Sequence, residues 1–287
     1  MDVSDLNPAN LVHVDRLILQ QLAIKLLQRK GMFVAEAQIV ADRMIEADLE
    51  QRPSEGIGTL PEYLDAMDLG DIDPRARMIT ISETPAIALL DGSTGMGHVA
   101  TTKAMEIAVQ KALTVGTGTV VLRNCRPCGD LGGIVRQAAV QGLIGLIATS
   151  FDTGSSDPAG ELTLAWGIPG PEGRAPLIQR GNNQPLNGAL PLLFSILSAG
   201  MAGAEPAPRK RKAVRAANTV EYSLMAISPN QFGTQDSFRA KWNALWPTSD
   251  APASVTQEPL TTVPLPPTDA TRLAELASKI KFEVSWS

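Results

Sequence analysis

The order of the predicted elements over residues 92–150 constrains the fold of this chain most strongly. Strands that alternate with helices are typical of α/β layers whose strands are partly parallel. We therefore expect an α/β (α+β) fold, with a mixed sheet flanked by helices and an N-terminal helical region. The elements are a helix in VATTKAMEIAVQKALTVG (99–116), a strand in TVVLRN (119–124), a helix in LGGIVRQAAVQG (131–142) and a strand in LIGLIATS (143–150).

Hydrophobic periodicity predicts further elements on either side of this segment. We expect helices over 14–31, 34–51 and 60–70, strands over 79–83 and 86–92, and later a strand over 221–228 and helices over 236–246 and 268–280. The last helix is predicted to be capped by Thr268 or Asp269. We expect residues 1–75 to pack with a strand/helix region at 205–287, and residues 76–204 to form the central α/β region.

Charge and hydropathy limit the partners of the chain. With 25 basic and 30 acidic residues, a net charge of −5 argues against nucleic acid or an anionic membrane as a partner. The basic run at 209–215 is expected to be a solvated loop, with a phosphate or acidic-partner site as the alternative.

The apolar run at 188–204 is too short for a membrane span and predicts a buried helix. Two cysteines and no recognisable signal peptide favour a cytoplasmic setting.

The sequence NCRPCG at 124–129 contains both cysteines, as a C-x-x-C between a predicted strand and a predicted helix. We interpret Cys125 and Cys128 as unreactive loop cysteines. A helix N-terminus favours a thiolate, so a reactive pair is one alternative, and half of a metal site is the other. We expect no metal, because His13 and His98 have no companions at ligand spacing.

Several segments, taken in order, resemble the type-2 malate/L-lactate dehydrogenase family, which includes sulfolactate and ureidoglycolate dehydrogenases. This resemblance implies the fold of that family, NAD(P)H-dependent reduction of small 2-oxo acids, and a homodimer. The similar segments are SEGIGTLPEY (54–63), LLDGSTGMGH (89–98), NCRPCG, ILSAGMAGA (196–204) and AISPNQFGTQDSF (226–238).

The departures from the family pattern occur where the chemistry is expected. Glu55 stands in place of the family's first histidine, Thr59 in place of its arginine, and Pro127 in place of a second histidine. The Asn-Pro of the family is absent at 160–163, and its lysine at 185–190. We therefore expect a divergent homologue with a reduced former cofactor-binding segment.

Three hypotheses follow from the resemblance and the departures. In the first, the chain has lost dehydrogenase activity and is a binding or scaffolding subunit, with a paralogous subunit as a candidate partner. Alternatively, it is a repurposed enzyme that acts on a small carboxylic acid, or it remains a reductase with a proton donor relocated to Glu55 or His98. The candidate site residues are Glu55, Cys125 and Cys128 for catalysis, Ser54, Thr59, Asn124 and Gly129 for substrate, and His98, Thr149 and Ser150 for NAD(P)H.

Overall fold

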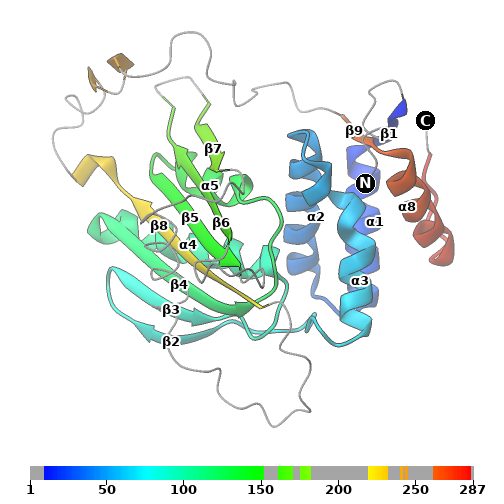
Figure 1. The fold of residues 1–287 in the computed structure, drawn as a ribbon, viewed down its shortest axis with the longest axis horizontal. Coiled ribbons are helices and arrows are strands. Elements are labelled where there is room, and N and C mark those ends of the chain that lie inside the picture. The colour runs from blue at the N-terminus through cyan, green and yellow to red at the C-terminus, as the bar shows by residue number, and fades with distance from the viewer. Residues whose placement is uncertain are drawn as a thin grey trace. The chain divides into compact units, whose positions relative to one another are not determined.

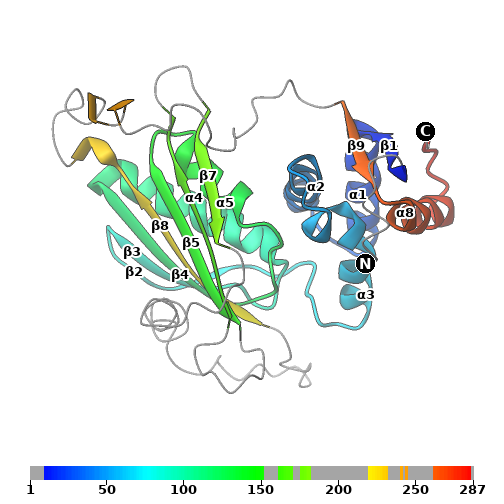
Figure 2. The ribbon, with the colours of Figure 1, turned by 45° about the horizontal axis from the view of Figure 1, so that its top comes forward.

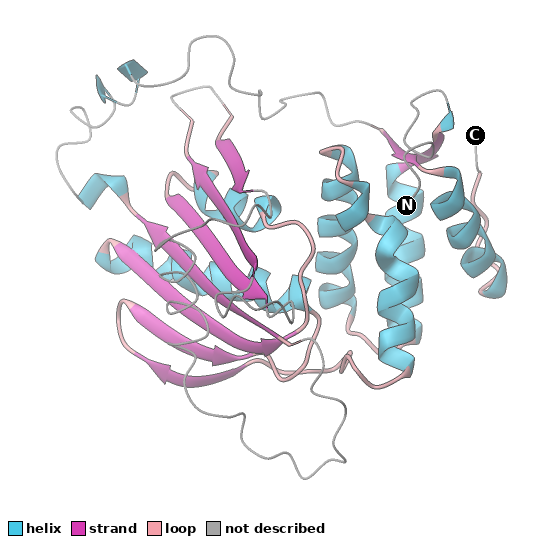
Figure 3. Ribbon diagram, viewed as in Figure 1, coloured by secondary structure: helices cyan, strands magenta, loops and turns pink. Residues whose placement is uncertain are grey.

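The computed structural model (Figure 1) describes residues 10–151, 161–170, 175–181, 219–231, 240–241, 243–244 and 261–285. The chain divides into two compact units, Met1–Ala76 with Gln257–Ser287, and Arg77–Thr256. Figure 3 shows that the described part of the first unit is mainly helical and that the second contains the large sheet. The predicted helix over 188–204 and the basic run at 209–215 lie outside the described residues.

The first unit begins with a strand that the sequence pattern did not indicate. β1 (Val12–Asp15) pairs antiparallel with β9 (Thr262–Leu265), so that Val14 lies opposite Val263. The predicted start of the first helix at residue 14 is therefore wrong. Helix α1 (Arg16–Arg29) begins after Asp15, whose carboxylate accepts hydrogen bonds from the backbone N–H groups of Leu17 and Ile18, as an N-cap side chain does.

The remaining helices of this unit include three that the sequence pattern predicts, over 34–51, 60–70 and 268–280, and two short ones that it does not. They are α2 (Val34–Leu49), the single-turn 3₁₀ helices η3 (Pro53–Glu55) and η4 (Ile57–Thr59), α3 (Leu60–Asp68) and α8 (Pro267–Lys279). The predicted cap of α8 is wrong: Pro266 is the N-cap, without a side-chain hydrogen bond. Pro267, at the first helical position, has a φ fixed near the helical value, which favours the start of the helix without a capping side chain.

The second unit contains a seven-stranded mixed sheet with the strand order β2-β3-β4-β8-β5-β6-β7. Among the described strands only β3 and β4 run parallel, and helix α4 connects them. The strands are β2 (Ile79–Glu83), β3 (Ile87–Asp91), β4 (Thr117–Cys125), β5 (Ile144–Phe151), β6 (Glu161–Ile168), β7 (Leu177–Gly181) and β8 (Val220–Ile227). The α/β fold class is confirmed.

Strand β8 lies in the centre of this sheet, antiparallel to both β4 and β5. The sequence grouped these residues with the C-terminal region. One face of the strand is buried, at Val220, Tyr222, Leu224 and Ala226, and the other face is mostly half-buried. Pairing with a strand on each side places β8 inside the sheet rather than at its edge. The short helix η6 (Pro229–Gln231) follows β8. Residues 240–241 and 243–244, inside the helix predicted over 236–246, are helical.

Helices α4 (Gly97–Val115) and α5 (Gly132–Ala139) contact each other and cover one face of the sheet (Figure 2). Small side chains bring α4 very close to β4: a Cβ atom on Gly118 would lie 2.0 Å from the backbone oxygen of Ala108. Ala104, Met105, Leu122 and Leu224 are fully buried in the core between these layers. No helix in the described parts of the chain is long and apolar enough to cross a membrane.

Candidate functional site

The loop that follows β3 and the end of β4 are joined through the side chain of Asp91. Its Oδ1 accepts hydrogen bonds from the backbone N–H of Ser93, at 2.8 Å, and from Nδ2 of Asn124, at 2.9 Å. Its Oδ2 lies 3.3 Å from Nε of Arg123. Two backbone hydrogen bonds, from Gly92 N to Arg123 O and from Thr94 N to Asn124 O, join the same two segments. One buried carboxylate therefore holds both segments together.

Both the loop after β3 and the end of β4 contain residues in the left-handed region of the backbone. The φ angles are 56° at Ser93, 58° at Thr94 and 55° at Asn124. Such angles are uncommon outside glycine and cost conformational energy that the surrounding contacts must offset. The hydrogen bonds around Asp91 supply those contacts. Asn124, a predicted substrate-binding residue, thus has a side chain that is already engaged by Asp91.

The N-terminus of α4 is covered by the NCRPCG loop. A Cβ atom on Gly97 would lie 2.0 Å from the backbone oxygen of Arg126, and Arg126 N donates to Gly95 O. His98, in the first turn of α4, is 1% exposed. This histidine, predicted as a cofactor contact, is thus enclosed by the protein.

The two cysteines are buried and reduced rather than displayed at a helix N-terminus. Cys125 is fully buried at the end of β4, and its thiol donates weakly to the backbone oxygen of Val220. Burial, reinforced by nearby negative groups, raises the pKa of the Cys125 thiol well above its ordinary value. The expectation that the motif favours a thiolate is therefore wrong for Cys125, because desolvation opposes the charged form.

Cys128 contacts a tyrosine on β8. The backbone N–H of Cys128 donates a 3.1 Å hydrogen bond to the phenolic oxygen of Tyr222, which is 1% exposed. Burial is also the main cause of a raised pKa for the Tyr222 phenol. Gly129, the next residue, has φ of 68°, which permits the tight turn at this point.

An ion pair closes the N-terminus of α5. Asp130 accepts a hydrogen bond from Gly133 N, and Arg180 of β7 donates to both Asp130 oxygens, at 2.6 and 2.7 Å. A Cβ atom on Gly132 would lie 1.9 Å from an Arg180 guanidinium nitrogen. The N-terminus of α5, which is the positive end of the helix dipole, is therefore already occupied by the side chain of Asp130.

The other predicted cofactor contacts are on β5. Thr149 is 1% exposed, and its hydroxyl donates to the backbone oxygen of Glu221 at 2.8 Å. Ser150 follows it in the strand, and its backbone is paired with Leu162 of β6 and Glu221 of β8.

In the first unit, the segment 54–59 forms consecutive 3₁₀ turns. Ser54 is exposed, and Glu55 and Thr59 are partly buried. The Thr59 hydroxyl donates to Gly56 O at 2.7 Å, within its own loop. Asp48 of α2 lies beneath this loop and accepts a 2.7 Å hydrogen bond from Ile57 N. Burial raises the pKa of Asp48 from 3.8 to about 8, and the nearby Asp269 adds to the rise.

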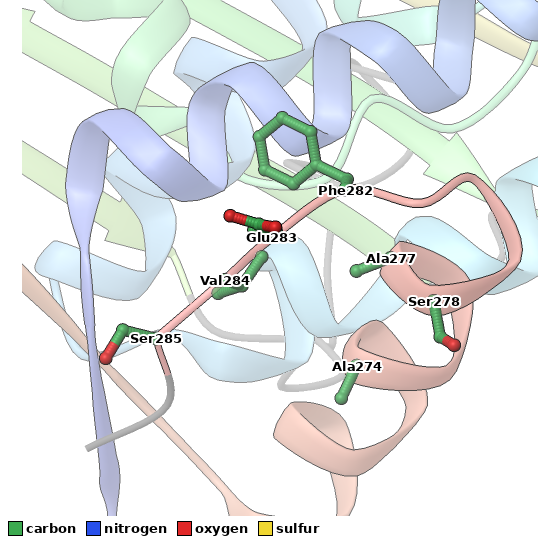
Figure 4. A pocket seen from close by; sticks show the side chains of 7 residues that line it. All are labelled: Ala274, Ala277, Ser278, Phe282, Glu283, Val284 and Ser285. Atoms are coloured by element: carbon green, nitrogen blue, oxygen red, sulfur yellow. The ribbon is translucent and has the colours of Figure 1, made fainter.

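A cavity of about 490 Å³ lies beside the end of α8 in this unit (Figure 4). Glu283 is its one ionisable lining residue, and Nζ of Lys25 lies 4.5 Å from the ring centre of Phe282, which also lines the cavity. None of the predicted site residues lines it. In the described residues, no group of three or more His, Cys, Asp or Glu side chains is arranged to hold a metal ion.

Comparison with known proteins decides the family. The sequence profile described as malate/L-lactate dehydrogenase matches residues 14–178. The chain belongs to this family. The L-sulfolactate dehydrogenase of Methanocaldococcus jannaschii is 38% identical to this family member over 133 residues, which is 46% of this chain and 39% of that protein. The malate dehydrogenase of Pyrococcus abyssi is 37% identical over 49% of this chain and 39% of that protein.

Solved structures show that the likeness in fold extends further than these alignments. The malate dehydrogenase of Pyrococcus horikoshii OT3 has a TM-score of 0.78 at 21% identity and covers 96% of this chain and 97% of that chain. The malate dehydrogenase of Entamoeba histolytica has a TM-score of 0.80 at 21% identity, over 95% and 99%. In the sequence alignments, however, this chain spans only about two fifths of the length of the M. jannaschii and P. abyssi relatives.

Sequence reasoning missed several groups that shape these loops, among them Asp48, Asp130, Arg180 and Tyr222. For Asp48, the sequence did contain an indication of burial. Val40, Met44 and Asp48 follow at four-residue steps on the buried face of α2, so an acidic residue continues an apolar stripe. A carboxyl in such a position is either paired, hydrogen-bonded or protonated.

Proposed function

We propose that this chain is a divergent member of the malate/L-lactate dehydrogenase family that does not reduce 2-oxo acids and serves as a binding or scaffolding subunit. One observation carries the proposal. The groups that remain available as proton donor or cofactor contact in the second unit, His98, Cys125 and Thr149, are all buried, at 0–1% exposure. A proton donor must come within hydrogen-bond reach of the substrate.

The described residues do not fit NAD(P)H well. A dinucleotide phosphate is commonly bound at an open helix N-terminus. Here the N-terminus of α4 is packed against the backbone of Arg126, and that of α5 carries Asp130 with Arg180. The Thr149 hydroxyl is engaged by a backbone oxygen. These contacts support a family member that does not depend on the nucleotide.

The substitutions in the 54–59 loop support the same conclusion. Thr59 has no charge with which to bind a carboxylate, and its hydroxyl is directed to Gly56 O. A carboxylate at Glu55 would repel an acidic substrate unless it were protonated. The raised pKa of Cys125 argues against the repurposed enzyme, because the thiolate is the nucleophilic form.

Titration with NADH and NADPH, followed by tryptophan-to-nicotinamide energy transfer, tests the proposal. The L-sulfolactate dehydrogenase of M. jannaschii, measured in parallel, is the positive control. We expect no saturable binding at millimolar nucleotide and no nucleotide oxidation with oxaloacetate or pyruvate. Micromolar binding with turnover would overturn the proposal in favour of a reductase with a relocated donor. The variants Glu55→Gln and His98→Gln would then identify that donor.

A further inference from the structure

Two acidic side chains from different helices enclose three consecutive residues of the first unit. A Cβ atom on Gly56 would lie 1.8 Å from Asp48 Oδ1, and a Cβ atom on Gly58 would lie 2.3 Å from Asp269 Oδ2. Between these glycines, Ile57 is fully buried and its N–H donates to Asp48 Oδ2 at 2.7 Å. Only glycine leaves room for carboxyl groups this close to the backbone.

Both carboxyl groups are removed from solvent. Asp48 is 3% exposed and Asp269 is 7% exposed. Asp48 Oδ1 is buried and has no hydrogen-bond partner. A fully charged carboxylate with an unsatisfied buried oxygen, next to a second carboxyl group, would be very costly. The arrangement therefore requires that the pair retain a proton.

The helix positions indicate where that proton resides. Asp48 lies in the last turn of α2 (Val34–Leu49), where the helix dipole is negative and disfavours a carboxylate. Asp269 lies in the first turn of α8 (Pro267–Lys279), where the dipole is positive and favours one. Asp48 is thus the member that retains the proton. The raised pKa of Asp48, with Asp269 among its causes, agrees with this assignment.

Apart from α1, the helices and strands that pack against α2 contribute no cation. Strand β9 and helix η4 contribute no charged side chain, and η3 contributes Glu55. Asp269 is the one charged group that shifts the pKa of Asp48, and it raises it. The charged residues of α1, which also packs against α2, are Arg16, Lys25 and Arg29.

We propose that the Asp48–Asp269 pair is a proton-controlled latch on the segment Gly56–Gly58. With one proton on the pair, Asp48 accepts the Ile57 N–H and the segment stays docked. Loss of that proton leaves a charged carboxylate buried against the same segment, at a cost that the Ile57 N–H offsets only in part, and the segment detaches. Because Ser54, Glu55 and Thr59 adjoin it, the latch controls the order of the loop that departs most from the family pattern. This inference does not depend on the proposed lack of dehydrogenase activity.

The sign of the pH effect follows from linkage. A carboxyl group that binds its proton more tightly when the loop is docked stabilises the docked form at low pH. This stabilisation is lost as pH rises through the pKa that the group has in the docked form. For Asp48 the relevant window extends from its ordinary value of 3.8 to about 8. Within that window the opening constant of the loop can rise by up to about tenfold per pH unit.

Hydrogen–deuterium exchange of the peptide that contains Ile57 tests the latch. Protection factors, corrected for the intrinsic pH dependence of exchange, are measured between pH 5 and 9 with far-UV circular dichroism at each pH. We expect protection to fall by up to about tenfold per pH unit and to level off above about pH 8. Asp48→Asn should remove this dependence, while Asp42→Asn, an uncharged substitution elsewhere on α2, should keep the wild-type profile.

A wild-type profile that does not change with pH would overturn the proposal, as would a persistent pH dependence in Asp48→Asn. Should Asp48→Asn not fold, Asp269→Asn provides the second test. Removal of the neighbouring charge is expected to move the end of the transition to lower pH, and an unchanged transition would count against the latch. NAD(P)H titration does not enter this readout, so the latch and the proposed function can fail separately.

Discussion

The phenolic oxygen of Tyr222 accepts a 3.1 Å hydrogen bond from the backbone N–H of Cys128. This contact connects β8, in the centre of the seven-stranded sheet, with the NCRPCG loop after β4. Because both residues are almost fully buried, the bond cannot be exchanged for one to water without opening the core. The loop geometry therefore depends on a residue that is remote in sequence.

Tyr222→Phe is expected to lower the free energy of unfolding by about 1–3 kcal/mol, since it leaves the buried Cys128 N–H without its acceptor. Urea titration followed by circular dichroism measures this change. The loss should be accompanied by faster alkylation of Cys128, while Cys125 stays protected because its burial does not involve the phenolic oxygen. Equal stability of wild type and variant would show that the hydrogen bond contributes nothing.

The thiols of the native protein should react slowly with Ellman's reagent at pH 7. Burial raises the pKa of Cys125, so the thiolate population falls and the reagent lacks access. Cys128 is 2% exposed, and we expect it to be protected because the reagent cannot reach it. Both thiols should react at once in about 6 M guanidinium, because that concentration unfolds even very stable proteins and exposes both side chains. Rapid stoichiometric labelling of Cys125 in the native state would contradict this prediction.

Arg180→Gln should destabilise the protein by about 3–5 kcal/mol, because Asp130 would remain buried with an uncompensated charge. The Asp130 side chain is only 4% exposed and the Arg180 side chain 18%. The double variant Asp130→Asn with Arg180→Gln should cost less than the sum of the single variants, which a double-mutant cycle measures. Additive losses would mean that the two side chains do not interact.

The contribution of Asp48 to the stability of the protein should fall as pH rises from about 4 to 8. Asp48 has a folded-state pKa of about 8, against an ordinary value of 3.8, so the folded state binds the proton more tightly. Its stabilising contribution is complete below pH 3.8 and is lost as pH rises through 8. The slope from this group is at most about 1.4 kcal/mol per pH unit.

Urea titrations at several pH values measure that slope, and Asp48→Asn serves as the reference. Burial also raises the pKa of the half-buried Glu221, which adds a contribution of the same sign. The difference between wild type and Asp48→Asn isolates the contribution of Asp48. Parallel pH profiles for the two proteins would contradict the prediction.

Local patterns were sufficient for much of the fold. The periodicity that ends at Gly116 predicts α4, and the structure confirms it, with Gly116 in the left-handed conformation that glycine adopts at helix ends. The strand over 119–124 was likewise confirmed as part of β4. The insertion of β8 between β4 and β5 was not predictable in this way, because nothing in residues 220–227 identifies which strands they pair with.

The candidate site was less accessible to sequence reasoning, because its chemistry depends on burial. The position of Cys125 before a helix suggested a stabilised thiolate, but the end of β4 lies inside the core, and desolvation acts in the opposite direction. The sequence likewise identified Glu55 and Thr59 by their departure from the family pattern, yet not Asp48, whose role appears only when Gly56 is packed against it.

The place of β8 has a consequence for the synthesis of the protein. Strands β4 and β5 each leave one edge for β8, yet Val220 follows Phe151 by a long stretch of chain. Translation at roughly 5–20 residues per second keeps these two edges unpaired for several seconds while β8 is still being made. Unpaired apolar strands readily pair with other chains. The growing polypeptide is therefore most vulnerable to aggregation on the ribosome, in the interval before residue 227 emerges.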